Sequence, residues 1–446
     1  MRSPARTASP STVRTLISLL CGVLAVPALL AREDWPQFRG PTGQGHSSER
    51  DLPLTWSEST NIAWKVPVPG SGWSSPVVAA GRVWLTTAVV EGSAARRQAV
   101  SLRALAFDVD TGRSLVDVEL FRLERPRTLN AKNNFASPTP VVDGDRVFVH
   151  FGADGTAALT TSGEVVWRKT LPYQSQHGGG GSPVLYRDLL IVSADGNPDE
   201  AFVTALDVRT GKERWKTWRR SPADQAYTTP LVIDAGGRDL LVSVGAYRAG
   251  AYDPLTGREV WRVGYGDGFS NVPRPVFGHG LVYIATGFQQ PALIAVRADG
   301  TGDVTRSHVA WQLRRGAPFT PSPLLVGDQL YVINDTGILT SVDARTGTVH
   351  YQERVDGNYS ASPVFADGRL YFQSEEGVTT VVAPGPVFQR LAVNRLDEAT
   401  LASMAVSGGS LFIRGHAHLY RIRDRASRPP GAASPSPVVA VGRPRE

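Results

Sequence analysis

A set of polar and aromatic residues, each placed just before a repeated strand start, is the best candidate for chemistry in this chain. Aromatic rings, amides and a cation gathered in one concave place are what a small-molecule or peptide site needs. If the segments before the strands converge on the mouth of a central channel, these residues form a binding site there; ordinary loop packing is the alternative. The set consists of Trp73, Asn134, His177, Tyr227, Asn271, Arg274, Phe319 and Tyr359.

The sequence offers little sign of catalysis or of metal binding. It contains no serine with glycine at both flanking second positions, no phosphate-loop lysine motif and no His-Glu-x-x-His. His416 and His418 would share one face of a strand, but no third ligand lies near them in the sequence. The run from His177 through four glycines could admit a ligand close to the backbone, although a tight start to a strand suffices to explain it. We predict no catalytic residue and no metal site.

The elements that must position these residues form a repeat. Strand starts marked by proline recur, and the steps between successive starts are 64, 43, 47, 45, 48, 40 and 41 residues. Self-similarity at such a period indicates a repeat architecture, and the long first step leaves room for an insertion. The starts are Pro76, Pro140, Pro183, Pro230, Pro275, Pro323, Pro363 and, without a proline, Met404.

The second strand of each repeat is apolar on both faces, as in Leu189 to Val192 and Leu281 to Ile284. Such strands need cover on both faces, which the radial stacking of sheets provides. The segment Asn61 to Val66 matches a last strand without earlier ones, whereas Met404 to Ile422 has early strands and no last one. We therefore predict an all-β, eight-bladed β-propeller of four-stranded antiparallel blades over residues 61–423, closed by the N-terminal strand pairing with the C-terminal blade.

Two further repeated features have structural explanations. An aromatic residue follows a turn glycine by four positions at Trp167, Trp215, Trp261 and Tyr351, and we interpret these rings as staples between blades. The Asp-x-x-Thr-Gly turns, which begin at Asp108, Asp207, Asp253 and Asp343, look like calcium loops, but each has glycine where an EF-hand needs an acid or amide at its fifth position. We interpret them as hairpin turns.

The ends of the chain differ from the repeats. Residues 1–31 combine three arginines, an apolar run and a small residue at Ala31, which predicts a secretory signal peptide cleaved there. A retained anchor and lipid modification at Cys21 are the alternatives. Residues 32–60 form an aromatic and proline-rich lead whose rings could cover a sheet edge, and residues 424–446 predict a disordered tail.

The net charge and the expected localisation limit the classes of partner that the chain could bind. The formal charge of +6 falls to +3 without the three arginines of residues 1–31, which is too slight to imply a nucleic-acid partner. The exported protein would have no membrane span and no cysteine, and we expect a periplasmic or extracellular monomer.

The turns Asp207 to Trp215 and Asp253 to Trp261, with the Ser-Pro-Val strand starts, resemble the PQQ-like β-propeller repeat of the quinoprotein alcohol dehydrogenase-like superfamily, over about Trp35 to Ile422. In its dehydrogenase branch the resemblance implies PQQ, calcium, an aspartate base and a ring of adjacent cysteines, and this chain has no cysteine pair. The other, BamB-like branch is non-enzymatic. It also includes uncharacterised exported bacterial propellers.

Two functional hypotheses result. The first is a non-catalytic extracytoplasmic propeller, without a cofactor, that binds a protein or peptide partner in the cell envelope at one mouth of its channel. The second is a PQQ-dependent dehydrogenase that oxidises an alcohol or sugar, with calcium, and with Arg274 holding the PQQ carboxylates. The missing cysteines favour the first.

Overall fold

A computed structural model describes residues 32–92, 99–175, 177–196, 200–219, 225–266, 268–288 and 290–424. The predicted signal peptide, Cys21 and the predicted tail beyond residue 424 lie outside the described residues.

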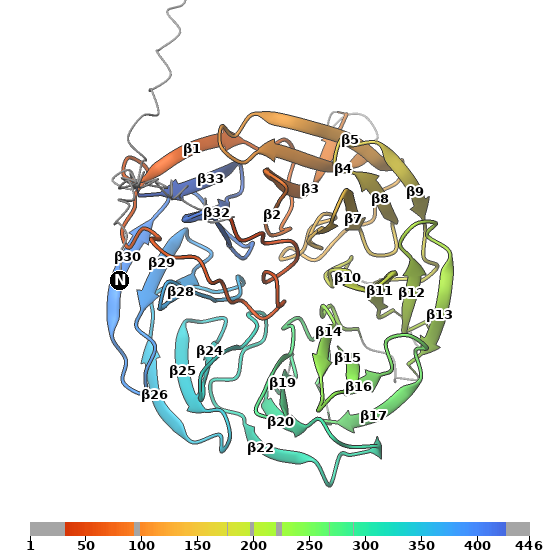
Figure 1. The fold of residues 1–446 in the computed structure, drawn as a ribbon, viewed down its shortest axis with the longest axis vertical. Coiled ribbons are helices and arrows are strands. Elements are labelled where there is room, and N and C mark those ends of the chain that lie inside the picture. The colour runs from red at the N-terminus through yellow and green to blue at the C-terminus, as the bar shows by residue number, and fades with distance from the viewer. Residues whose placement is uncertain are drawn as a thin grey trace, which may run out of the picture. The chain divides into compact units, whose positions relative to one another are not determined.

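The described chain forms eight antiparallel sheets arranged in a ring, so the predicted eight-bladed propeller is confirmed (Figure 1). The first four blades consist of β2 (Val77–Ala79), β3 (Arg82–Glu91), β4 (Ala99–Asp108) and β5 (Ser114–Leu123); β6 (Val141–Asp143), β7 (Arg146–His150), β8 (Thr156–Thr160) and β9 (Val165–Lys169); β10 (Val184–Tyr186), β11 (Leu189–Ala194), β12 (Phe202–Asp207) and β13 (Glu213–Trp218); and β14 (Leu231–Asp234), β15 (Asp239–Val244), β16 (Arg248–Tyr252) and β17 (Glu259–Gly264).

The other four blades follow the same plan, and β21 (Gly302–Asp303) adds a short parallel fifth strand to the fourth blade. They consist of β18 (Val276–Gly278), β19 (Leu281–Ala285), β20 (Leu293–Arg297) and β22 (Val309–Leu313); β23 (Leu324–Val326), β24 (Gln329–Ile333), β25 (Ile338–Asp343) and β26 (Val349–Arg354); β27 (Val364–Ala366), β28 (Arg369–Gln373), β29 (Val378–Val382) and β30 (Arg390–Arg395); and β31 (Ala405–Ser407), β32 (Ser410–Arg414), β33 (His418–Arg423) and β1 (Ile62–Pro67).

The core lies between blades because the middle strands are apolar on both faces. Every residue of β12 and of β19 is buried, whereas β1 alternates half-buried and exposed residues at the outer rim. One cluster of buried side chains joins β15 to β19, from neighbouring blades. Covering both faces of the middle strands therefore requires the ring.

The ring closes as predicted. Strand β1 pairs antiparallel with β33, with Lys65 opposite Tyr420 and Val66 opposite Leu419. The ring centroids of Trp64 and Phe412 lie 6.0 Å apart. The first strand and the last three strands of the described chain thus share one blade, which removes a free sheet edge at the seam.

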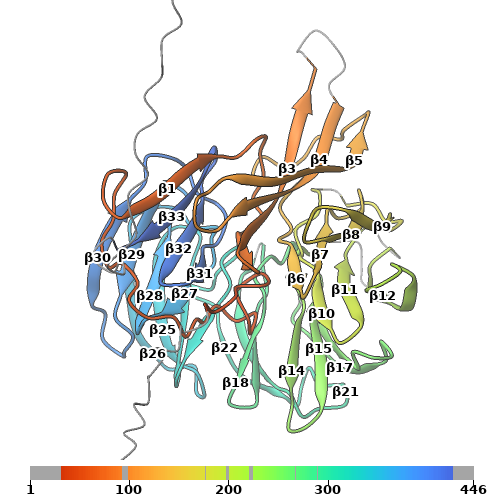
Figure 2. The same ribbon diagram turned by 45° about the horizontal axis from the view of Figure 1, so that its top comes forward.

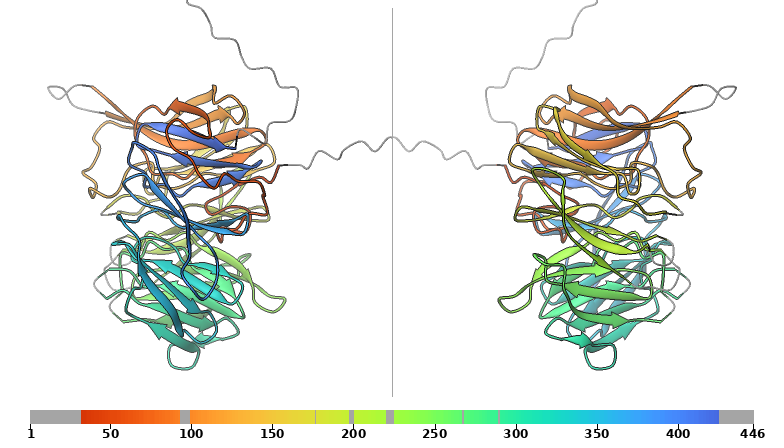
Figure 3. Two further views of the ribbon diagram at one scale, coloured as in Figure 1. Left: turned by 90° about the vertical axis from the view of Figure 1, so that its left-hand side faces the viewer. Right: turned by 90° about the vertical axis from the view of Figure 1, so that its right-hand side faces the viewer.

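The long first repeat contains a hairpin. Strands β3 and β4 have ten residues each, and their outer ends project from one face of the ring (Figure 2). The lead lies at the opposite face (Figure 3). This extension and the segment between β5 and β6 account for the step of 64 residues.

Indole rings link neighbouring blades, as the repeated aromatic positions predicted. Each donates its N–H to a backbone carbonyl, and a Cβ at Gly257 would lie 2.4 Å from the Trp215 ring, so the turn glycine makes room for the indole. Tyr351 instead packs on Phe388. The indole bonds are Trp64 to Val109 (3.1 Å), Trp167 to Val208 (3.0 Å), Trp215 to Pro254 (3.1 Å), Trp261 to Ala298 (3.0 Å) and Trp311 to Ala344 (3.0 Å).

The Asp-x-x-Thr-Gly turns are held by their own aspartates. Asp207 Oδ1 accepts hydrogen bonds from the backbone N–H of Arg209 and Thr210 and from the Thr210 hydroxyl, at 2.9–3.1 Å. The carboxylate therefore serves the turn, as expected for a hairpin.

Asp207→Ala should lower the free energy of unfolding by about 1 to 2 kcal/mol, because three hydrogen bonds to a largely buried carboxylate are lost. Urea denaturation measures this change. The loss should be the same with calcium and with EDTA; a loss that appears only in calcium would instead indicate a metal loop.

Candidate functional site

A cavity of about 500 Å³ lies within the ring. Segments that precede the first strands line most of it, and Phe38 of the lead lines it as well. The lead crosses the first strands of several blades: Trp35 pairs with Val78, and the Gln44 side chain accepts a hydrogen bond from the Phe277 N–H at 2.6 Å. The lead runs across one face of the channel (Figure 1). We therefore infer that the cavity has its mouth at the other face.

A belt of hydroxyl side chains surrounds the channel. Each belongs to the residue just before a strand start, and its oxygen accepts the backbone N–H of the corresponding residue in the preceding blade. These bonds satisfy backbone groups that the short first strands leave unpaired. They run from Ser75 to Thr139, Thr139 to Ser182, Ser182 to Thr229, Arg274 to Ser322, Ser322 to Ser362, and Ser362 to Ser403, at 2.8–3.1 Å.

Aromatic rings line one side of the cavity. The centroids of Phe269 and Phe288 lie 5.6 Å apart, as do those of Phe288 and Phe319. Phe288 is 48% exposed, which is unusual for so large an apolar side chain beside a cavity. On the neighbouring stretch His177 packs on Tyr227, with centroids 6.1 Å apart. The mouth therefore offers an apolar surface next to the hydroxyl belt.

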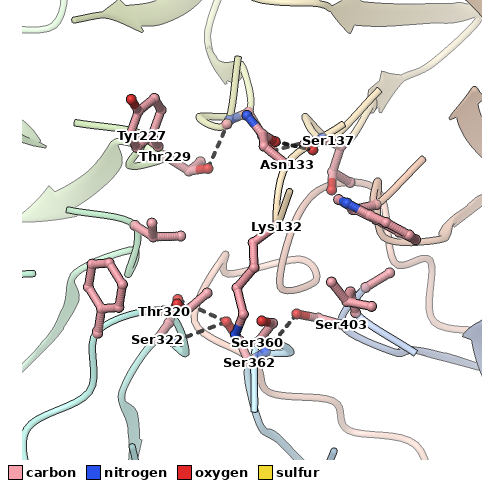
Figure 4. A pocket seen from close by; sticks show the side chains of 18 of the residues that line it. Lys132, Asn133, Ser137, Tyr227, Thr229, Thr320, Ser322, Ser360, Ser362 and Ser403 are labelled. Atoms are coloured by element: carbon pink, nitrogen blue, oxygen red, sulfur yellow. Dashed lines mark hydrogen bonds between the residues drawn. The ribbon is translucent and has the colours of Figure 1, made fainter. Parts of the chain in front are cut away.

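One lysine extends across the cavity. Lys132 points from the segment before β6 toward Ser360 and Ser362 (Figure 4), and its Nζ lies 2.9 Å from Glu375 Oε1. The residues lining the cavity include Lys132 and no carboxylate. A partner with an acidic group could therefore compete with Glu375 for this ammonium.

The cavity gathers some of the predicted site residues. Trp73, His177, Tyr227 and Phe319 line it. Asn134, Asn271, Arg274 and Tyr359 do not belong to its lining, although a residue adjacent in sequence to Asn134, to Asn271 and to Tyr359 does.

Hydrogen bonds hold the side chains of these four residues in place. Asn134 Nδ2 donates to Ser71 Oγ at 2.9 Å, and Asn271 Nδ2 donates to the Gly245 carbonyl at 2.7 Å. Tyr359 donates to the Asp356 carbonyl at 3.1 Å. Arg274 is 2% exposed and donates to Phe38 O at 2.7 Å and to Pro230 O at 3.1 Å. Its burial lowers the Arg274 pKa to about 9, so it remains a cation at neutral pH.

Sequence reasoning missed the hydroxyl belt, Lys132, Phe269 and Phe288 as lining residues. A signal for the belt was present, since a serine or threonine precedes six of the seven strand-start prolines. Arg274 occupies the one position of the seven that has no hydroxyl, so a buried cation stands there instead.

The histidines considered for a metal have other partners. His418 Nδ1 lies 3.0 Å from Glu398 Oε1, while His416 lies in the turn before β33 and packs on Trp73. Gly180 and Gly181 face the next blade, where added Cβ atoms would lie 2.6 Å from Tyr227 Cβ and 2.5 Å from Thr228 O. Two of the four glycines thus permit close packing between blades.

The cavity residues do not fit PQQ and calcium. Calcium takes six to eight oxygen ligands, carboxylates among them, and no group of three His, Cys, Asp or Glu residues that could hold a metal occurs within the described ranges. Arg274, the candidate for the PQQ carboxylates, directs its guanidinium to the backbone carbonyls of Phe38 and Pro230 and does not itself line the cavity.

A second, small cavity between blades contains buried titratable groups. His150 and Asp195 both line it, and Asp195 pairs with Arg219 at 2.9 Å. Burial lowers the pKa of His150 to about 4. Burial raises the pKa of Asp195 to about 6, although Arg219 acts in the opposite direction.

Comparisons with known proteins agree with this architecture. The family described as outer membrane protein assembly factor BamB matches residues 103–306, 245–354 and 298–384. No curated protein sequence matches the chain. In the part of the chain that the structure describes, no helix is long and apolar enough to cross a bilayer.

Three solved structures resemble the chain in fold. BamB from Moraxella catarrhalis is 14% identical, with a TM-score of 0.58 over 82% of this chain and 98% of its own. The computationally designed Ika8 protein is 11% identical, with a TM-score of 0.53 over 84% of this chain and 100% of its own. A europium-containing methanol dehydrogenase is 12% identical, with a TM-score of 0.49 over 79% of this chain and 89% of its own.

Proposed function

The chain belongs to the PQQ-like β-propeller family that is described by the assembly factor BamB, and from this premise we propose that it is a non-catalytic, extracytoplasmic propeller that binds a protein or peptide partner. The binding place is the mouth of the cavity. The partner's apolar side chain packs against the three phenylalanines, and its polar groups meet the hydroxyls and Lys132.

The observation that carries this proposal is the chemistry of the cavity lining. Aromatic side chains and hydroxyls suit recognition, and Phe288 is exposed where a partner could cover it. The dehydrogenase alternative is disfavoured because the donor set for calcium and the position of Arg274 do not suit that chemistry.

Photo-cross-linking tests the proposal. A benzophenone amino acid at Phe288, in protein secreted into the native envelope, should give one discrete adduct, and Phe319→Asp in the same chain should remove most of it. The matched control places the benzophenone at Val387, which is 76% exposed on the connection between β29 and β30 and does not line the cavity. An identical adduct from both positions, or none from Phe288, would contradict a partner at the mouth.

The alternative and the location have their own tests. Purified protein mixed with PQQ and calcium should show no change in tryptophan fluorescence and no alcohol-dependent dye reduction; either signal would reinstate the dehydrogenase.

Cells that make the full chain should hold it outside the cytoplasm, and deleting residues 1–31 should retain it inside.

A further inference from the structure

Two buried arginines without acidic partners lie where the lead meets the ring. Arg39 is 1% exposed and Arg274 is 2% exposed. No ion pair among the described residues includes either of them, whereas the equally buried Arg219 pairs with Asp195 at 2.9 Å. A buried charge is normally paired, so these two cations need a counter-charge from elsewhere.

The hydrogen bonds of Arg39 are incomplete as well. Its Nη2 has one long contact, 3.5 Å from the Pro363 carbonyl, while its Nε and Nη1 are buried with no partner in the described part of the chain. Arg274 uses its Nε and Nη1 on carbonyls, but its Nη2 lies 3.5 Å from Gln37 Oε1. A guanidinium carries five N–H donors, and most of those on Arg39 remain available to an acceptor.

The backbone of the lead encloses both guanidinium groups. A Cβ at Gly43 would lie 2.5 Å from Arg274 Nη1, and a Cβ at Gly45 would lie 2.8 Å from Arg39 Nη2. Burial lowers the pKa of each arginine to about 9, and the charge of Arg274 further lowers that of Arg39. The two guanidinium groups therefore lie against glycines two positions apart in the lead, and both are cationic at neutral pH.

We propose that Arg39 and Arg274 together bind one small inorganic anion of halide size, which holds the lead against the ring of blades. A single-atom anion accepts the free N–H groups of Arg39 and offsets one of the two positive charges without requiring donors of its own. We expect a single-atom anion and not an oxyanion such as sulfate, because Gly43 and Gly45 bring the backbone of the lead against both guanidinium groups.

Thermal unfolding of the protein from residue 32 onward tests the site. Bromide or chloride should replace gluconate in steps up to 50 mM at constant ionic strength, and Tm should rise with the logarithm of the halide concentration once it exceeds Kd, by about 3 °C at about 100 times Kd. Sulfate, at the same ionic strength, should give no rise of this logarithmic form. The rise should disappear in Arg39→Gln.

Arg414→Gln is the matched control. Arg414 is also 2% exposed and lacks a carboxylate, but its Nη1 lies within 2.6–3.3 Å of three oxygens of Ser74 and Thr86. This variant should lose stability and keep the halide response. If Arg39→Gln does not fold, anomalous scattering from bromide-soaked crystals of the unaltered protein decides. A peak between Arg39 and Arg274 supports the proposal; bromide found only elsewhere, or a Tm independent of halide, overturns it.

Discussion

Trp261→Ala should lower the free energy of unfolding by about 3 to 5 kcal/mol, measured by urea denaturation. The indole is fully buried between the fourth and fifth blades, and its N–H donates to the Ala298 carbonyl at 3.0 Å. Truncation leaves a large cavity and an unpaired carbonyl, and both terms act in the same direction. Trp261→Phe should give a smaller loss because it refills most of the cavity.

Trp218→Ala is the control for the loss of an indole as such. Trp218 is 52% exposed at the end of β13, where it packs on Phe202. Its replacement should cost at most about 1 kcal/mol, since little area returns to water. Equal losses at the two positions would contradict the assignment of Trp261 as a staple between blades.

The sequence predicts this fold well because the same local features recur from repeat to repeat. Strand starts, apolar middle strands and turn glycines repeat with a nearly constant period, so each copy reports the same local structure independently. Closure was predictable because Asn61 to Val66 matches a last strand without earlier ones, whereas the last repeat has early strands without a last one. Both inferences depend on patterns along the chain, and both are confirmed.

The site was less predictable because side-chain direction depends on contacts distant in sequence. Position before a strand placed Tyr227 and Phe319 at the cavity, but the same rule could not show that Asn271 would bond to Gly245. The passage of the lead across the channel also rests on such distant contacts, among them Arg274 to Phe38. The sequence of the lead has no repeated pattern from which these contacts could be predicted.

His150 should make the stability of the protein depend on pH between about 4 and 6.5. The imidazole is 1% exposed, its Nδ1 lies 2.8 Å from Thr156 Oγ1, and burial lowers its pKa to about 4. In the unfolded chain its pKa is about 6.5, so on acidification the unfolded chain takes up a proton that the folded protein refuses. The stability that neutral His150 provides is therefore complete above about pH 6.5 and lost as the pH falls, by about 3 kcal/mol at pH 4.

The difference in unfolding free energy between the wild type and His150→Gln measures this term. It should move in favour of the variant by about 3 kcal/mol between pH 7 and pH 4, because glutamine does not titrate. Asp195, in the same small cavity, acts oppositely: with its pKa raised by burial to about 6, its contribution is complete below about pH 4 and lost as the pH rises through 6.

Comparison of the two proteins cancels the Asp195 contribution, which the pH dependence of either protein alone would not. His350→Gln, which replaces a histidine at an exposed position of β26, is the matched control. Imidazole signals in NMR spectra provide an independent reading, since the His150 ring should stay neutral to about pH 5 while the protein remains folded. A pH-independent difference, together with a His150 ring that titrates near pH 6.5, would show that the imidazole reaches water and is not enclosed between the second and third blades.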